Sequence, residues 1–216
     1  MKNVQTKAVI FDMDGVLLDS ETISWKTWEL AAQELGLENI HTANEKCMGA
    51  SSFDIHRILR SIYGENFDSE AFLKRTYELF FEIESKDGIP LMPFVNEALE
   101  YLSKKYILAL ASSTRKVHVI RQLTHAGIID YFKTITTGDM VKHSKPDPEI
   151  YLMACKSLNL QPKECAAIED SPNGIKSAYK AGLKTIMIPD KIQPDEDIKK
   201  ISWKILSSLK EINTIL

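Results

Sequence analysis

The stretch VIFDMDGVLLDSE, residues 9–21, places two aspartates directly after an apolar run. Residues 7–11 have the pattern of a short strand that is buried on both faces, as in a parallel sheet. Asp12 and Asp14 lie one residue apart at the end of this run, where their charges would repel each other. The pattern therefore predicts a buried strand that ends where something positively charged binds.

Four more apolar runs have the same strand-like pattern, at residues 107–112, 133–137, 165–169 and 184–188. Segments with helical periodicity separate them, such as residues 95–106, 116–127 and 147–160. Residues 171–182 begin with a Ser cap and Pro172 at the first helical position. Strands that alternate with helices predict an α/β fold with a parallel sheet covered by helices on both faces.

One long segment interrupts this alternation. Residues 20–90 contain helical periodicity and no convincing strand, and about 70 residues are too many for a loop between a strand and a helix. We therefore predict an inserted helical domain over residues 20–90 and a core domain made of residues 1–19 and 91–216. In the first predicted helix of the insert, Trp25, Trp28, Ala31, Ala32 and Leu35 fall on one face.

The composition narrows the class of protein. With 44% hydrophobic and 26% charged residues the chain is an ordinary globular protein, and a net charge of -3 argues against a nucleic-acid partner. No apolar run approaches the ~20 residues of a membrane span, and the N-terminus lacks a signal-peptide pattern. Cys47, Cys155 and Cys165 are widely spaced, which is typical of reduced thiols. These features predict a cytoplasmic protein without a membrane partner.

Polar side chains follow each of the first four predicted strands. Because ligands bind outside the carboxyl ends of parallel strands, we expect these groups to converge. Carboxylate oxygens suit Mg²⁺, which also bridges to phosphate. One carboxylate can attack phosphorus to form an aspartyl-phosphate, and a second can protonate the leaving oxygen. The converging groups are Asp12, Asp14, Ser112, Ser113, Thr114, Arg115, Lys145, Glu169, Asp170 and Ser171.

The segments DMDGVLLDSE, ALASST, SKPDPEIY and IEDSPNGIKSAYKAG resemble, in order and spacing, the four motifs of the haloacid dehalogenase superfamily. The resemblance runs from residue 7 to about residue 189 and points to the phosphatase and β-phosphoglucomutase-like branch. It implies a Rossmann-like sheet with the first strand between the second and the fourth. It also implies that the helical insert between the first two motifs is a cap domain.

The resemblance further implies roles for the converging residues. Asp12 would be the nucleophile and Asp14 the general acid/base. The phosphoryl group would be bound by Ser112, with Ser113 beside it, and by Lys145. The implied cofactor is Mg²⁺, with ligands from the Asp12 carboxylate, the Asp14 carbonyl and Asp170, and with Glu169 as a further ligand or as the partner of a metal-held water.

Simpler interpretations exist for several of these residues. A calcium-binding EF-hand loop that starts at Asp12 needs Gly at its sixth and Glu at its twelfth position, where this chain has Leu17 and Ile23, so that interpretation fails. Ser112, Ser113 or Thr114 could simply cap the next helix, and Asp170 could do the same for the helix after it. Lysines such as Lys145 are usually surface residues.

The predicted function is that of a Mg²⁺-dependent phosphatase, which would hydrolyse a small phosphomonoester, such as a sugar phosphate, through an aspartyl-phosphate. The alternative is a β-phosphoglucomutase-type mutase, which shares all the core motifs. Ser24 and Ser52 fall where such mutases carry a histidine and a phosphate-binding arginine, and both differences favour the phosphatase. Lys74 and Arg75 could replace that positive charge. Residues 48–52, MGASS, resemble the cap loop that faces the active site in this superfamily.

Overall fold

The structure is a computed structural model of the 216-residue chain, and it describes residues 5–48, 50 and 52–216. The chain divides into two compact units. The core unit runs up to Asp19 and resumes at Pro90, and the helical unit is Ser20–Ile89. Within the described residues, no helix combines the length and the apolar character that a bilayer crossing requires.

The core unit contains a six-stranded parallel sheet with the strand order β3-β2-β1-β4-β5-β6. The first strand lies between the second and the fourth, which confirms the predicted Rossmann-like α/β fold. All four residues of the first strand are fully buried, as expected for a central parallel strand with both faces covered. The strands are β1 (Ala8–Phe11), β2 (Ile107–Ser112), β3 (Thr134–Thr137), β4 (Cys165–Glu169), β5 (Lys184–Met187) and β6 (Lys204–Ile205).

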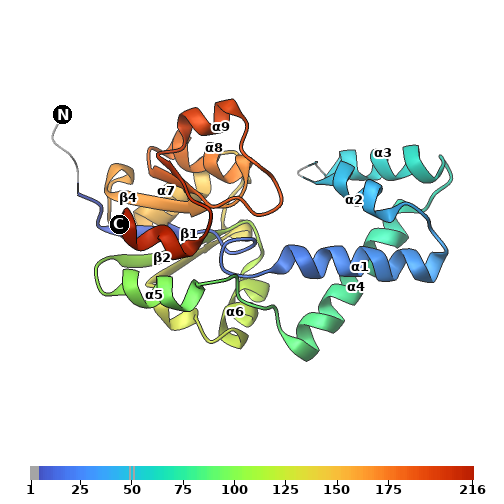
Figure 1. The fold of residues 1–216 in the computed structure, drawn as a ribbon, viewed down its shortest axis with the longest axis horizontal. Helices are drawn as coiled ribbons and strands as arrows, with labels where there is room; N and C mark the ends of the chain where they lie inside the picture. Colours follow the sequence, from blue (N-terminus) through green and yellow to red (C-terminus); the bar gives the residue numbers. More distant parts are fainter. Residues whose placement is uncertain (1–4, 49, 51) are drawn as a thin grey trace. The chain divides into compact units, whose positions relative to one another are not determined.

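The helices of the core unit cover both faces of this sheet. Figure 1 shows α7 and α8 on one face and α5 and α6 on the other. Small side chains of β1, β2 and β4, such as Ala109 and Ala167, pack against Ile150 and Ala154 of α7. The helices of this unit are α5 (Val95–Ser103), α6 (Lys116–His125), α7 (Glu149–Ser157), α8 (Pro172–Ala181) and α9 (Glu196–Ile201).

Helix α8 shows why the chain folds as predicted near the site. Ser171 is its N-cap, and the side-chain oxygen accepts a hydrogen bond from the Gly174 N–H. Pro172 occupies the first helical position, and Gly182 ends the helix in the left-handed conformation with φ 88°. These local signals fix the start of α8 directly after β4, so Glu169 and Asp170 are held at the carboxyl end of the sheet.

The register of the sheet sets the position of the first aspartate. Phe11 pairs with Leu110 of β2 and with Ile168 of β4. Asp12, the next residue, therefore lies between the ends of two neighbouring strands, at the point where the strand order reverses. This is the switch point at which open α/β sheets bind ligands.

The helical unit has a core of its own, in which Trp28, Ala31 and Ala32 of the first helix pack with Phe72 of the fourth. Leu35 was predicted on the same face but is 55% exposed, and it is the last residue of its helix. The helices of this unit are α1 (Ser20–Leu35), α2 (Ile40–Cys47), α3 (Ser52–Tyr63) and α4 (Ser69–Asp87).

Candidate active site

Lys145 links the ends of the central strands of the core unit. Its Nζ lies 2.6 Å from Asp12 Oδ1, 2.6 Å from Glu169 Oε1 and 3.0 Å from the carbonyl oxygen of Ala111. All three ammonium protons therefore have an acceptor. The Lys145 side chain is only 8% exposed, so the interpretation of this residue as a surface lysine is wrong.

The ionisation of these groups reflects burial and neighbouring charge. Burial raises the pKa of Asp12 from 3.8 to about 7; Lys145 opposes this rise, whereas the charges of Glu169 and Asp14 add to it. Burial also disfavours the Lys145 ammonium, but the two carboxylates beside it outweigh burial and raise the Lys145 pKa. Burial, together with Glu169 and Asp12, holds the pKa of Asp170 well above its ordinary value. With no cation bound, the site therefore favours protonated carboxyl groups, because one lysine cannot neutralise all of them when they are ionised.

An acidic cluster at this point fits a hard cation. Asp12, Glu169 and Asp170 each offer a carboxylate oxygen, and the three oxygens lie within 4.8 Å of one another. Gly15 lets Asp170 approach the turn that follows β1, because a Cβ at this glycine would come within 2.5 Å of Asp170 Oδ2. The donors are all oxygens, which is the set that Mg²⁺ prefers. Among the predicted metal ligands, the structure brings these three carboxylates together.

Asp14 has a different environment from the acidic cluster. Its Oδ2 accepts a hydrogen bond of 2.9 Å from the Thr114 hydroxyl, which lies just beyond the end of β2. Asp14 is half-buried, whereas Asp12 is buried. A carboxyl group that is oriented by a hydroxyl and still reaches solvent is suited to exchange protons with a leaving group and with water.

The predicted phosphate-binding serines differ from each other. Ser112 is fully buried, and its Oγ accepts the Thr114 N–H at 3.1 Å, whereas Ser113 is exposed. The alternative that one of these residues caps the next helix is wrong. Asp139 accepts the Lys116 N–H at 3.0 Å instead, from the segment that follows β3.

Capping alone is also a wrong interpretation of Asp170, because Ser171 caps α8. The Asp170 carboxyl group instead belongs to the acidic cluster around Asp12.

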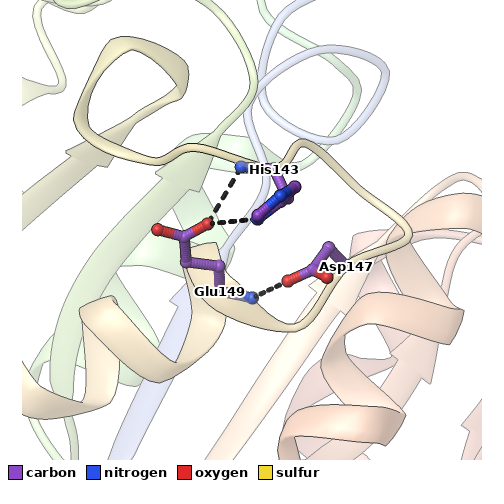
Figure 2. Close-up of side chains that lie close together, drawn as sticks. All are labelled: His143, Asp147 and Glu149. Atoms are coloured by element: carbon purple, nitrogen blue, oxygen red, sulfur yellow. Dashed lines mark hydrogen bonds and ion pairs between the residues drawn. The ribbon is translucent and has the colours of Figure 1, made fainter.

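A second group of possible metal ligands lies in the loop that carries Lys145. Figure 2 shows His143, Asp147 and Glu149, whose possible ligand atoms lie within 4.8 Å of one another. Glu149 Oε2 already accepts the N–H groups of Lys142 and His143 at 3.0 and 2.9 Å, and Asp147 Oδ1 accepts the Glu149 N–H. These hydrogen bonds tie the loop to the first turn of α7. The cluster therefore fastens the segment from which Lys145 extends.

Sequence reasoning missed one residue that contacts the site and assigned no role to another. Thr114 was expected among the converging groups without a role in binding or catalysis, and Tyr151 was not considered. The Tyr151 hydroxyl donates a hydrogen bond of 2.6 Å to Glu169 Oε1. The apolar pattern of residues 147–160 places Tyr151 on the buried face of a helix, which was a signal that its hydroxyl needs a partner.

In the helical unit, the side chains that line the cavity at Ser24 are uncharged. Ser24 lines a cavity of about 200 Å³ together with hydroxyl and aromatic side chains, among them Thr27, Trp28 and Tyr77. The Arg75 guanidinium forms hydrogen bonds of 2.7 and 2.8 Å with both carboxylate oxygens of Glu34 and a third of 3.2 Å with Glu82.

Lys74 is 77% exposed and lies 3.9 Å from Glu78. Of the MGASS loop, Gly49 and Ser51 lie outside the described residues.

Comparison with known proteins agrees with this geometry. A family model described as haloacid dehalogenase-like hydrolase matches residues 9–188. A phosphorylated carbohydrates phosphatase of Thermotoga maritima is 35% identical over 83% of this chain and 83% of its own length. A β-phosphoglucomutase of Bacillus subtilis is 32% identical over 82% of this chain and 80% of its own length. The crystal structure of a β-phosphoglucomutase from Clostridium difficile has 25% identity and a TM-score of 0.72, and covers 96% of this chain and 93% of that one.

The matched residues contain all four motifs and every group of the acidic cluster. Phosphatases and a mutase both occur among the relatives, as expected for the branch that the motifs indicated. With its parallel sheet and its aspartates at the switch point, this chain belongs to the haloacid dehalogenase-like hydrolase family.

Proposed function

We propose that the protein is a Mg²⁺-dependent phosphatase of a small phosphomonoester, preferably a sugar phosphate. The observation that carries this proposal is the placement of Lys145 Nζ within 2.6 Å of both Asp12 and Glu169, beside a three-carboxylate cluster. One ammonium and one divalent cation would together offset the cluster and the phosphoryl oxygens. The name of the carbohydrate phosphatase relative supports a sugar phosphate as substrate.

The reaction follows from the positions of two aspartates. A carboxylate oxygen of Asp12 attacks phosphorus, the bond from phosphorus to the leaving oxygen breaks, and the Asp14 carboxyl group gives its proton to that oxygen. Asp14 then takes a proton from water, the resulting hydroxide oxygen bonds to phosphorus, and the bond to Asp12 breaks to release inorganic phosphate. Thr114 keeps Asp14 oriented for both transfers.

The remaining polar groups bind and orient the substrate. Lys145, together with Ser112, would hold the phosphoryl oxygens, on which negative charge accumulates. Mg²⁺ held by Asp12, Asp170 and Glu169 would supply positive charge to the same oxygens. We further propose that the helical unit, which the sequence predicts over residues 20–90, acts as the cap domain that excludes bulk water.

The helical unit favours hydrolysis over mutase chemistry. A mutase has to bind a second, distal phosphate with positive charge, whereas the cavity beside Ser24 has neutral walls. Arg75 is occupied by Glu34 and Glu82, and so it is a poor replacement for the missing cation. A substrate with one phosphate and a neutral, hydroxylated remainder suits these features.

Phosphate release tests the proposal. The protein is incubated with β-glucose 1-phosphate, glucose 6-phosphate and p-nitrophenyl phosphate, with Mg²⁺ or with EDTA, and Asp12→Asn is the control. We expect inorganic phosphate with Mg²⁺ only, and none from the variant. A trace of glucose 1,6-bisphosphate is added to one β-glucose 1-phosphate sample. Rapid formation of glucose 6-phosphate there, with inorganic phosphate near background, would establish the mutase instead.

A further inference from the structure

Tyr151 is a buried polar residue that the reaction described above does not use. It lies in the first turns of α7, is fully buried, and donates its hydroxyl proton to Glu169 Oε1 at 2.6 Å. Buried tyrosines usually hydrogen-bond to some partner, but here the partner is a carboxylate of the acidic cluster. A hydrogen bond to an ionised acceptor is roughly twice as strong as one between neutral groups.

The Glu169 carboxylate is confined on several sides. Lys145 Nζ and the Tyr151 hydroxyl both lie 2.6 Å from Oε1, and the Ser171 hydroxyl lies 3.3 Å from Oε2. Gly174 leaves the space in which the carboxylate sits, because a Cβ at that position would come within 1.9 Å of Oε2. Of these three donors, Tyr151 and Lys145 form the short hydrogen bonds to Glu169.

In the substrate-free protein, Lys145 has no spare proton for a phosphoryl oxygen. Its three protons are already directed at Asp12, Glu169 and the Ala111 carbonyl. Binding a phosphoryl oxygen therefore requires that Lys145 weakens or releases one of these bonds. If the released bond is the one to Glu169, a second donor has to keep the carboxylate in place.

We propose that Tyr151 is a positioning residue, which holds the Glu169 carboxylate in the metal-binding cluster while Lys145 turns to the phosphoryl group. The movement of Lys145 to a phosphoryl group rests on the proposed function. The hold of Tyr151 on Glu169 does not, because it concerns Mg²⁺ binding by the substrate-free protein. The Tyr151 ring also lies against the lysine, with Nζ 5.3 Å from the ring centroid. Tyr151→Phe keeps this ring and removes only the hydroxyl.

Isothermal titration with Mg²⁺ alone tests the inference without any turnover. We expect Tyr151→Phe to raise the Mg²⁺ dissociation constant about 10-fold, the range found when partners of metal ligands are removed. Tyr101→Phe is the matched control, because the Tyr101 hydroxyl donates to the backbone carbonyls of Asn213 and Leu216 and not to the cluster. This control should bind Mg²⁺ within twofold of wild type.

A double-mutant cycle separates positioning from a general loss of stability. If Tyr151 acts through Glu169, Tyr151→Phe should change Mg²⁺ affinity less than twofold when it is combined with Glu169→Gln. A merely structural tyrosine would weaken binding by the same factor in both backgrounds. That result overturns the inference, as does a Tyr151→Phe protein that binds Mg²⁺ as wild type does.

The two proposals fail in different ways. If wild type binds Mg²⁺ and the cycle shows coupling but no phosphomonoester is hydrolysed, the proposed function falls and the positioning role on the metal cluster stands. If phosphate is released and Tyr151→Phe leaves Mg²⁺ affinity unchanged, the function stands and the role of Tyr151 falls. A wild-type protein that binds no Mg²⁺ overturns both.

Discussion

Removal of the Asp12 charge should stabilise the Mg²⁺-free protein while it abolishes turnover. Unfolded Asp12 loses its proton near pH 3.8, whereas burial raises the folded pKa to about 7. Between these values the folded state binds more protons than the unfolded state, so its stability falls as the pH rises. Asp12→Asn has no proton to lose, and we expect its advantage over wild type to grow from about pH 4 to about pH 7.

The size of this effect follows from the same two values. A pKa change from 3.8 to about 7 corresponds to about 4 kcal/mol, because each tenfold change in proton binding is ~1.4 kcal/mol. Part of this is offset, since Lys145 loses one of its two charged partners in the variant. We therefore expect Asp12→Asn to gain about 1–3 kcal/mol above neutral pH. That gain corresponds to a Tm increase of roughly 3–10 °C for a chain of this length.

Thermal melts in EDTA, followed by circular dichroism from about pH 5 to about pH 8.5, measure this difference. Asp139→Asn is a control with the opposite sign. Hydrogen bonds from the Thr137 hydroxyl, the larger cause, and from the Lys116 N–H hold the pKa of exposed Asp139 below its ordinary value. The Asp139 charge therefore stabilises the folded state at pH values above the ordinary pKa of the group. The reasoning is refuted if Asp12→Asn is no more stable than wild type at high pH, or if the difference does not change with pH.

Two further substitutions test the division of labour in the site. Asp14→Asn should slow turnover of alkyl phosphates by about 10²–10⁴-fold, the range of general acid–base catalysis. Asp14→Asn should not slow the initial burst of p-nitrophenolate, which accompanies phosphorylation of Asp12 by p-nitrophenyl phosphate, because that leaving group needs no proton. A burst slowed as much as alkyl phosphate turnover would argue against the acid role of Asp14. Glu149→Ala removes two hydrogen bonds from the Lys145 loop. Because each bond is worth ~1 kcal/mol, we expect KM to rise by up to about 30-fold at similar kcat. Glu196→Ala, which removes a first-turn glutamate from α9, should leave KM unchanged, and equal effects of the two substitutions would contradict the loop argument.

Much of the fold was predictable because its signals are local. Five of the six strands coincide with apolar runs of four to six residues, and Ser171, Pro172 and Gly182 delimit α8 by their own backbone preferences. The helical segment between Ser20 and Ile89 was visible as a long stretch without strand pattern. Strand β6, Lys204–Ile205, was missed because two exposed residues carry no periodicity.

The order of polar residues along the chain was sufficient to expect a site at the carboxyl ends of the strands, because parallel strands bring those ends to one edge. Which side chain meets which was decided only by the tertiary structure. Asp14 and Thr114 are 100 residues apart, and Asp12 and Lys145 are 133 apart. The sequence motif does not distinguish the two neighbouring serines, whereas in the structure Ser112 is buried and Ser113 is exposed.

The same limit applies to the partner of Tyr151. Sequence places Tyr151 on the buried face of a helix and Glu169 at the end of a strand, each from its own periodicity. That the hydroxyl reaches the carboxylate depends on how α7 packs across the sheet, and on a glycine at position 174 that leaves room for the carboxylate. Local propensity determined the helices and strands and where they end. Close packing between distant elements determined the hydrogen bonds of the site, because a bond of 2.6 Å requires a relative placement that no local pattern encodes.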